Sequence, residues 1–194
     1  MNLRTRYRHL LTCDHAAELS RCSRDPVYWI NTWCWTYDPR RPDIRWIPFE
    51  LWPAQDQYIR WLISVVRRGG PSTVVKPRDV GASWLNAAFA VWCLCYLEGA
   101  SIGMASRKLM YVESGSPDSL FGKAWSILER LPQWMRPPVR RVRSPMPLIR
   151  NLSNGSELKG EGGDNVGRGG RSLWYLLDEA AYLEDQESVE SAVA

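Results

Sequence analysis

Residues 72–97 constrain the fold of this chain more than any other stretch. A short β-branched run at 72–76 predicts a strand, a loop follows at 77–81, and an apolar helix is expected over 83–97. Strands that alternate with helices in this way are typical of an α/β domain with a mostly parallel sheet. In such domains the ligand chemistry gathers at the carboxyl ends of the strands.

The rest of the chain extends this alternation. Helices are expected at 55–68 and 118–131, and strands at 100–105, 148–152, 156–160 and 172–177. Asn154-Gly155 is a hairpin signal between two of these strands. We therefore expect an α/β domain at 48–194. It follows a helical N-terminal lead-in at 1–47, with expected helices at 9–22 and 25–37, and a proline-rich extended stretch at 38–53.

Length and composition narrow the class of protein. At 194 residues the chain holds one domain of ordinary size plus an appendage. Its longest apolar stretch, residues 87–97, is too short to cross a bilayer. The five cysteines lack metal-ligand spacing, which favours a reduced, cytosolic chain without structural zinc. The 21 arginines suit a phosphate-bearing partner, although coding bias explains them equally well.

The loop before the long apolar helix has the setting of a phosphate-binding loop. Backbone N–H groups at a helix N-terminus attract anions, and the usual pattern is G-x-x-x-x-G-K-[ST]. Here Lys76 takes the first place, Gly81 the second glycine, Ala82 the lysine and Ser83 the hydroxyl. Lys76 and Arg78 could supply the missing charge, and Ser83 could coordinate a metal. The alternative is a plain strand-to-helix turn that Ser83 caps.

A hydrophobic strand that ends in adjacent carboxylates is the second feature. It reads LWYLLDEAAYLED and begins about a hundred residues after the loop. In ATPases with a phosphate loop, the aspartate at such a strand end holds Mg²⁺ and the next glutamate activates water. Asp178 and Glu179 fill these two places. The alternative is that the acidic pair begins a helix, where it favours the helix dipole.

Two weaker features complete the set. The glycine-rich stretch 159–172 carries Arg168 and Arg171, which could reach a phosphate of a nucleotide or nucleic acid or lie in a solvated loop. Gln55 follows an aromatic, proline-rich stretch at an expected helix start. Its amide could pair with an adenine edge or be an ordinary helix residue.

In this order, the segments resemble the N-terminal ATPase domain of the large terminase subunit of tailed bacteriophages. The resemblance covers about residues 25–194 and rests on PFELWPAQ, VVKPRDVGASW, SIGMASRK, NGSELKGEGG, GRGGRS and LWYLLDEAAYL. Family members commonly have a deviant phosphate loop with an arginine at the place of Arg78. Some carry the lysine at the start of the loop, as Lys76 does here.

The resemblance implies a P-loop NTPase fold of the RecA/ASCE type that binds ATP and Mg²⁺. Its implied nucleotide contacts are Gln55 to adenine and, around the phosphates, Lys76, Arg78, Gly81, Ala82 and Ser83. Ser83 and Asp178 are the implied Mg²⁺ ligands, and Glu179 the catalytic base, assisted by Arg78. An arginine finger at Arg168 or Arg171 is a weaker expectation.

The resemblance also implies partners. Family members use ATP hydrolysis to drive double-stranded DNA into a procapsid, as a homo-oligomeric ring docked on the portal protein and served by a small terminase subunit. They work in the host cell cytoplasm, without a membrane. The coupling motif and nuclease domain are expected beyond Ala194, so we expect a fragment without nuclease activity. Two alternatives stay open: a catalytically silent nucleotide-binding or assembly module, suggested by Ala82, and a helicase-like nucleic-acid ATPase.

Overall fold

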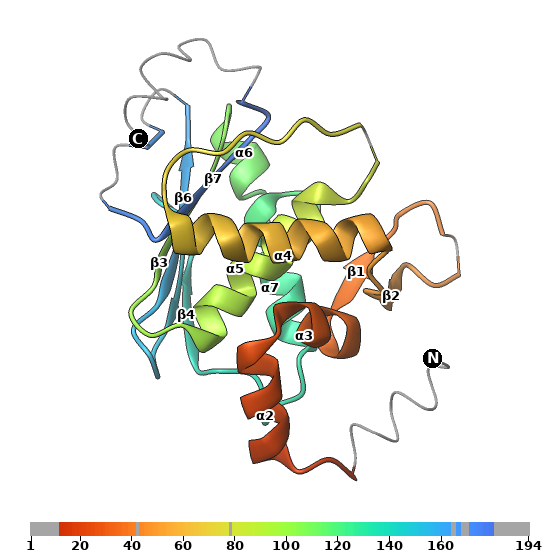
Figure 1. Cartoon of the computed structure of the whole chain (residues 1–194). Coiled ribbons are helices and arrows are strands. Elements are labelled where there is room, and N and C mark those ends of the chain that lie inside the picture. The colour runs from red at the N-terminus through yellow and green to blue at the C-terminus, as the bar shows by residue number, and fades with distance from the viewer. Residues whose placement is uncertain (1–11, 42, 78, 164–165, 168–170, 181–194) are drawn as a thin grey trace.

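The structure, a computed structural model, describes residues 12–41, 43–77, 79–163, 166–167 and 171–180. Over these residues the chain is a mixed α/β protein in which a five-stranded sheet carries the described helices on one side (Figure 1). None of the described helices is both long enough and apolar enough for a membrane crossing.

The described helices are α2 (His15–Arg24), α3 (Pro26–Trp33), α4 (Pro53–Arg68), α5 (Ala82–Tyr96), α6 (Leu109–Val112) and α7 (Leu120–Arg130). The described strands are β1 (Trp35–Tyr37), β2 (Trp46–Pro48), β3 (Ser101–Ser106), β4 (Val139–Val142), β5 (Leu148–Asn151), β6 (Glu157–Gly162) and β7 (Trp174–Asp178).

The large sheet has the strand order β4-β5-β6-β3-β7. β3 pairs in parallel with β6 and with β7, whereas β5 pairs antiparallel with β4 and with β6. The expected Asn-Gly hairpin between β5 and β6 is confirmed, with Gly155 at a positive φ of 74°. The expected α/β sheet is present, but it is mixed, because short connections join β4, β5 and β6 into an antiparallel meander.

The strand predicted at 72–76 is not formed. These residues are not part of a described strand, and Val75 is 96% exposed. Pro71 and Pro77 bracket the run, and neither offers a backbone N–H to a neighbouring strand. A β-branched composition therefore does not suffice here to build a strand.

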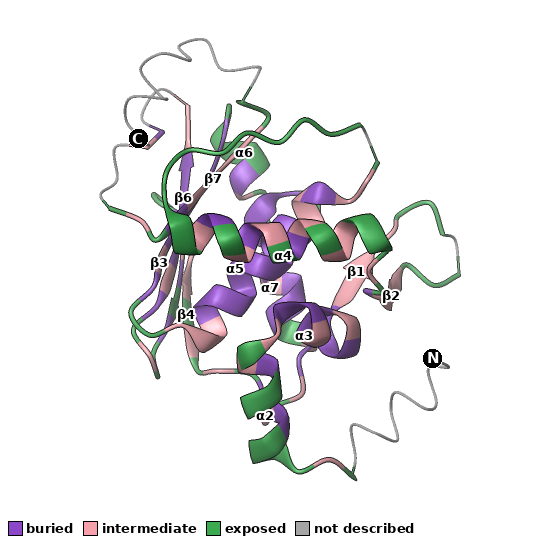
Figure 2. Cartoon of the chain, in the orientation of Figure 1, coloured by how far each residue is buried: buried purple, intermediate pink, exposed green. Residues whose placement is uncertain are grey.

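The core surrounds α5, which is apolar on all sides. Eleven of its 15 residues are buried, as expected for a helix at the centre of a domain. It packs against β3, β5 and β6 on one side and against α3, α4 and α7 on the other. Figure 2 shows this helix as buried along most of its length. Burial of a side chain such as Phe89 contributes about 2–3 kcal/mol, so the position of α5 is firmly set.

The N-terminal region is only partly helical. Asp14 caps α2 and Asp25 caps α3, the latter with the expected Asp-Pro start. The helix expected at 25–37 ends at Trp33, however, because the next residues form β1, which pairs antiparallel with β2. This hairpin crosses the predicted boundary at residue 47, and Trp29 and Trp33 belong to the same core as α5.

On the face of the sheet away from the helices, one aromatic side chain connects neighbouring strands. Gly103 on β3 pairs with Tyr175 on β7, and a Cβ at position 103 would lie 2.1 Å from the Tyr175 ring. The ring therefore crosses β3. Its hydroxyl donates to Glu161 on β6 at 2.6 Å and accepts from the Gly167 backbone N–H at 2.9 Å. Three strands and part of the glycine-rich stretch are thereby linked.

Candidate functional site

The two sequence features predicted to form a site meet in the structure. Ser83 is the second residue of α5, and Asp178 is the last residue of β7. The Ser83 hydroxyl donates a hydrogen bond to Asp178 Oδ2 at 2.9 Å. Residues 95 positions apart in the chain therefore place a hydroxyl and a carboxylate at one point, at the carboxyl end of the parallel strands.

The loop enters α5 through a left-handed residue. Gly81 precedes the helix with φ 74° and ψ 15°, a conformation that glycine adopts without steric cost. Among the described residues, no side chain caps this helix end. The first N–H groups of α5 therefore face the loop without a helical partner, and the helix dipole adds partial positive charge.

Gln55 ties the loop to the beginning of α4. Its side-chain Nε2 donates to the Val80 carbonyl at 3.0 Å, and its Oε1 accepts from the Trp52 backbone N–H at 3.0 Å. Both ends of the amide are thus engaged within the chain. The predicted contact with adenine remains a prediction. The observed hydrogen bonds give Gln55 a second role, because they hold the loop against the start of α4.

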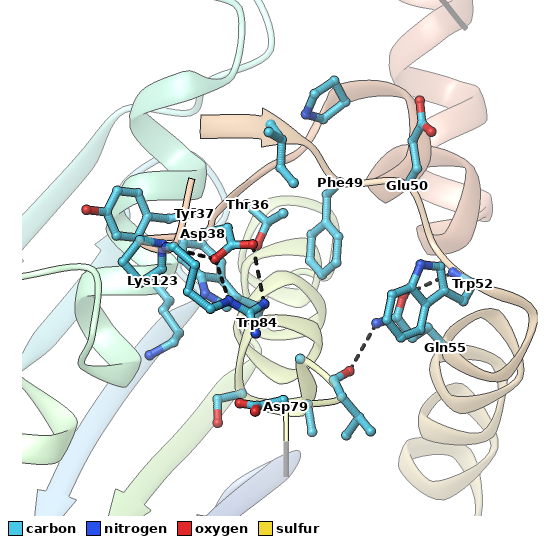
Figure 3. Close-up of a pocket in the computed structure, with 18 of the residues that line it drawn as sticks. Thr36, Tyr37, Asp38, Phe49, Glu50, Trp52, Gln55, Asp79, Trp84 and Lys123 are labelled. Carbon is cyan, nitrogen blue, oxygen red and sulfur yellow. Dashed lines mark hydrogen bonds and ion pairs between the residues drawn. The ribbon is translucent and has the colours of Figure 1, made fainter. Parts of the chain in front are cut away.

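A cavity of about 520 Å³ lies over the start of α5. The β1–β2 hairpin, the start of α4, the loop and α7 line it, and Figure 3 shows Trp52 and Gln55 across the cavity from Lys123. Phe49, Trp52 and Trp84 contribute aromatic surface, and Lys76, which is exposed, also lines the cavity. The volume lies in the range of small-molecule sites.

An aromatic ring, with a cationic group over it, packs against Trp84, which lines this cavity. The rings of Trp46 and Trp84 meet edge to face at 6.0 Å, and the Arg130 guanidinium lies 3.2 Å from the centroid of the Trp46 ring. Burial lowers the pKa of Arg130. The hairpin is thereby fixed against α5 and α7.

A second cavity of about 140 Å³ adjoins the first. It is lined by Ser83, Ser106, Asp118, Lys123, Asp178 and Glu179 together with two apolar or aromatic residues. Ser83 and Lys123 line both cavities, so the two spaces meet at the start of α5. The predicted metal ligands and the predicted base border this smaller space.

Glu179 has an uncommon backbone conformation, and its carboxylate forms an ion pair with Arg107. Its backbone has φ 60°, an uncommon value for a residue with a side chain, and such residues cluster at functional sites. The Glu179 carboxylate lies 3.4 Å from Arg107 Nε and is 46% exposed. Arg107 follows β3 and also lies over the Tyr111 ring. A contact between Glu179 and a guanidinium was not expected from the sequence.

Lys123 is the site residue that the sequence reasoning missed. It lies on α7, is 9% exposed, and its ammonium donates to the Asp118 carbonyl. Burial lowers the pKa of Lys123, while the charges of Asp118 and Asp178 oppose that shift. A signal was present: Lys123 lies three residues after Leu120 and four before Ile127, on the apolar face of the helix.

Other predicted residues are placed less closely. Ala82 is buried at the start of α5 and lines the larger cavity, together with Gly81. Arg78 and Arg168 lie outside the described residues. Arg171 is exposed and is not among the described residues that line either cavity.

No protein-family model matches this chain, and no curated protein matches it at a significant level. Its function is therefore inferred from the geometry of the site.

Proposed function

We propose that this chain is the ATPase domain of a DNA-packaging motor of the large terminase type, with a P-loop NTPase fold. The observation that carries the proposal is the 2.9 Å contact between Ser83 and Asp178. It joins an open helix N-terminus, which suits phosphates, to a strand-end carboxylate, which suits a metal ion.

The arrangement of strands supports this fold. β6, β3 and β7 run in parallel, and α5 begins at the carboxyl end of β7. Nucleotides commonly bind at this edge of α/β sheets. The antiparallel strands β4 and β5 lie at the opposite side of the sheet, away from the candidate site.

ATP would occupy the larger cavity, with its phosphates at the start of α5 and its base toward Phe49 and Trp52. The donors near the phosphates fit Mg²⁺, because a hydroxyl and a carboxylate are hard oxygen ligands. Among the described residues there is no cluster of three or more His, Cys, Asp or Glu that could hold a metal ion, so Ser83 and Asp178 would share Mg²⁺ with the phosphates. When bound by Ser83 and Asp178, Mg²⁺ neutralises charge on the phosphate oxygens.

Glu179 would act as the base. Its carboxylate orients a water molecule and accepts a proton as the water oxygen attacks the terminal phosphorus and ADP leaves. The Glu179 carboxylate instead lies 3.4 Å from Arg107 Nε. We infer that Arg107 holds Glu179 in a resting position, which the active state of the motor releases.

The test compares steady-state ATP turnover of the wild type with Glu179→Ala, in the presence of double-stranded DNA and Mg²⁺. We expect a loss of about 100-fold or more. Glu98→Ala is the matched control, since Glu98 is exposed just beyond the far end of α5, and its turnover should equal that of the wild type. Equal turnover in the wild type and Glu179→Ala would overturn the proposal.

Ala82 and the Arg107–Glu179 pair favour one alternative, a silent nucleotide-binding module. Tight ATP binding by the wild type without turnover, also with DNA and in an oligomerised sample, would support that alternative. Unwinding of a forked duplex without stimulation by a portal protein would instead indicate a helicase-like ATPase.

A further inference from the structure

A buried ammonium group lies where the two cavities meet. Lys123 is 9% exposed and lines both the cavity of about 520 Å³ and the one of about 140 Å³. It lies 5.9 Å from the centroid of the Trp84 ring, and Trp84 follows Ser83 in the first turn of α5. The amine is therefore close to the predicted phosphate and metal positions.

Burial of a lysine is costly unless its charge is compensated. The described hydrogen bond from Lys123 goes to the Asp118 carbonyl and uses one of three N–H donors. Asp118 and Asp178 supply negative charge nearby. The ammonium thus retains donor capacity at the smaller cavity, and an anion bound there would be a strong acceptor.

Among the described residues of the loop, none is a buried cation. Ala82 stands where the usual pattern has lysine, and Lys76 is exposed at the opposite end of the loop. Among the described residues that line the smaller cavity, Lys123 is the one cation. Within the described part of the chain, the positive charge beside Ser83 therefore comes from Lys123 on α7.

We propose that Lys123 Nζ binds the terminal phosphate of the nucleoside triphosphate and thereby replaces the lysine that the loop lacks. The proposal rests on the proposed function, since it concerns the same nucleotide site. If Lys123 has only a structural role and holds the turn before α7, its substitution leaves the ratio of ATP to AMP affinity unchanged.

The first experiment measures the affinities of ATP and AMP, each with Mg²⁺, by titration calorimetry or competition. Lys123→Met keeps the length and apolar stem of the side chain but removes the charge. We expect ATP affinity to fall about tenfold or more and AMP affinity to stay within about twofold. Lys159→Met is the matched control, because Lys159 lies on the far face of the sheet beside Gly103, and both affinities should be retained.

The outcomes separate the two proposals. Failure of the wild type to bind ATP would overturn both. Wild-type binding of ATP with an unchanged ratio of ATP to AMP affinity in Lys123→Met would overturn only the role of Lys123. Thermal unfolding of each variant checks that the comparison is made on folded protein.

A second experiment uses the wild-type chain and needs no substitution. An acyl phosphate of ATP transfers its acyl group to an amine near the terminal phosphate: the amine attacks the acyl carbon, the acyl–phosphate bond breaks, and ATP leaves with loss of an amine proton. Peptide mass spectrometry should locate the acyl group on Lys123, with suppression by excess ATP and no acylation of Lys159. Acylation of Lys76 in place of Lys123 would overturn the proposal.

Discussion

The two halves of the candidate site are positioned in different ways. Asp178 lies at the end of β7, where the backbone pairing of β7 with β3 sets its place opposite Ser106. The described residues between α4 and Gly81 are not part of the sheet, and Val75 among them is 96% exposed. Side-chain contacts, from Gln55 to Val80 and from Ser83 to Asp178, connect the loop and the start of α5 to the rest.

This contrast teaches where the site is sensitive to change. A carboxylate placed by a row of backbone hydrogen bonds keeps its position when one side chain is altered. A loop placed by single side-chain contacts loses its geometry when either contact is removed. Substitutions in the loop should therefore change nucleotide binding, whereas those in the sheet away from its site-facing end should change stability first.

Asp178→Asn should have the largest effect. The substitution keeps the shape of the side chain but removes the charge that a metal ion requires, so we expect ATP turnover to fall by at least about 100-fold at saturating Mg²⁺. Asp56→Asn, in an exposed pair with Arg60 on α4, is the control. Turnover within about threefold of the wild type in Asp178→Asn would contradict the assigned metal role.

Gly81→Ala should have the next largest effect. At φ 74° an alanine is strained by about 1 kcal/mol, and we expect ATP affinity to fall about tenfold as the start of α5 shifts. Gly99→Ala is closely matched, because Gly99 has φ 62° and open space around it, but lies beyond the far end of α5. Equal nucleotide affinities in the two variants would show that the backbone at residue 81 is not part of the site.

Gln55→Ala should have a smaller effect. It removes the bond to the Val80 carbonyl and the bond from the Trp52 N–H, so we expect a loss of about 1 kcal/mol in stability and about fivefold in ATP affinity. Gln57→Ala, at an exposed position on the same helix, serves as the comparison. Urea unfolding and nucleotide titration measure the two quantities. A loss in ATP affinity without a loss in stability would indicate that Gln55 contacts the adenine directly and does not act by holding the loop.

Glu157→Gln should have the smallest effect. It should lower the stability of the fold without changing ATP affinity, and only at a pH where the Glu157 carboxylate is ionised. Burial raises the pKa of Glu157, but hydrogen bonds from Lys159 and Arg150 outweigh it, so the pKa lies below its ordinary value. A lowered folded-state pKa contributes stability above the unfolded pKa of about 4.3, and this contribution disappears as pH falls through the folded-state value.

We expect Glu157→Gln to lower the free energy of unfolding at pH 7 by about 1 kcal/mol or less, because its partners are partly exposed. The difference from the wild type should vanish near pH 3, and ATP affinity at pH 7 should not change. Urea unfolding at the two pH values checks the first expectation. A loss of ATP affinity would show that the sheet and the loop are coupled more closely than the contrast implies.

Elements with a strong apolar signal could be predicted from the sequence. α5 and β7 were expected within one or two residues of their observed bounds, because an all-apolar helix and an apolar strand with a charged end leave few alternatives. The prediction of a strand at 72–76 was wrong, because a strand needs a neighbouring strand to pair with, and composition does not reveal whether one is present. The β1–β2 hairpin and β4 were missed, since short strands among prolines and arginines show no clear period-two pattern.

The site residues that belong to a recognisable sequence motif could be predicted. Ser83 and Asp178 were both expected as Mg²⁺ ligands; their side chains lie 2.9 Å apart, and their role toward the metal stays a prediction. The contact between Arg107 and Glu179, and the approach of Lys123 to the cavities, depend on how β3 and α7 pack beside the loop. A single lysine on an apolar helix face gives no indication of what lies opposite it, so its place could be seen only in three dimensions.

The crossing of β3 by the Tyr175 ring has a consequence for variation among related chains. A Cβ at position 103 would lie 2.1 Å from that ring, so glycine is required as long as the tyrosine is present. Related sequences should therefore change positions 103 and 175 together, with a larger residue at the first accompanying a smaller one at the second. In a library that randomises both positions, survivors should show the same coupling, and a variant with alanine at 103 alone should be rare among them.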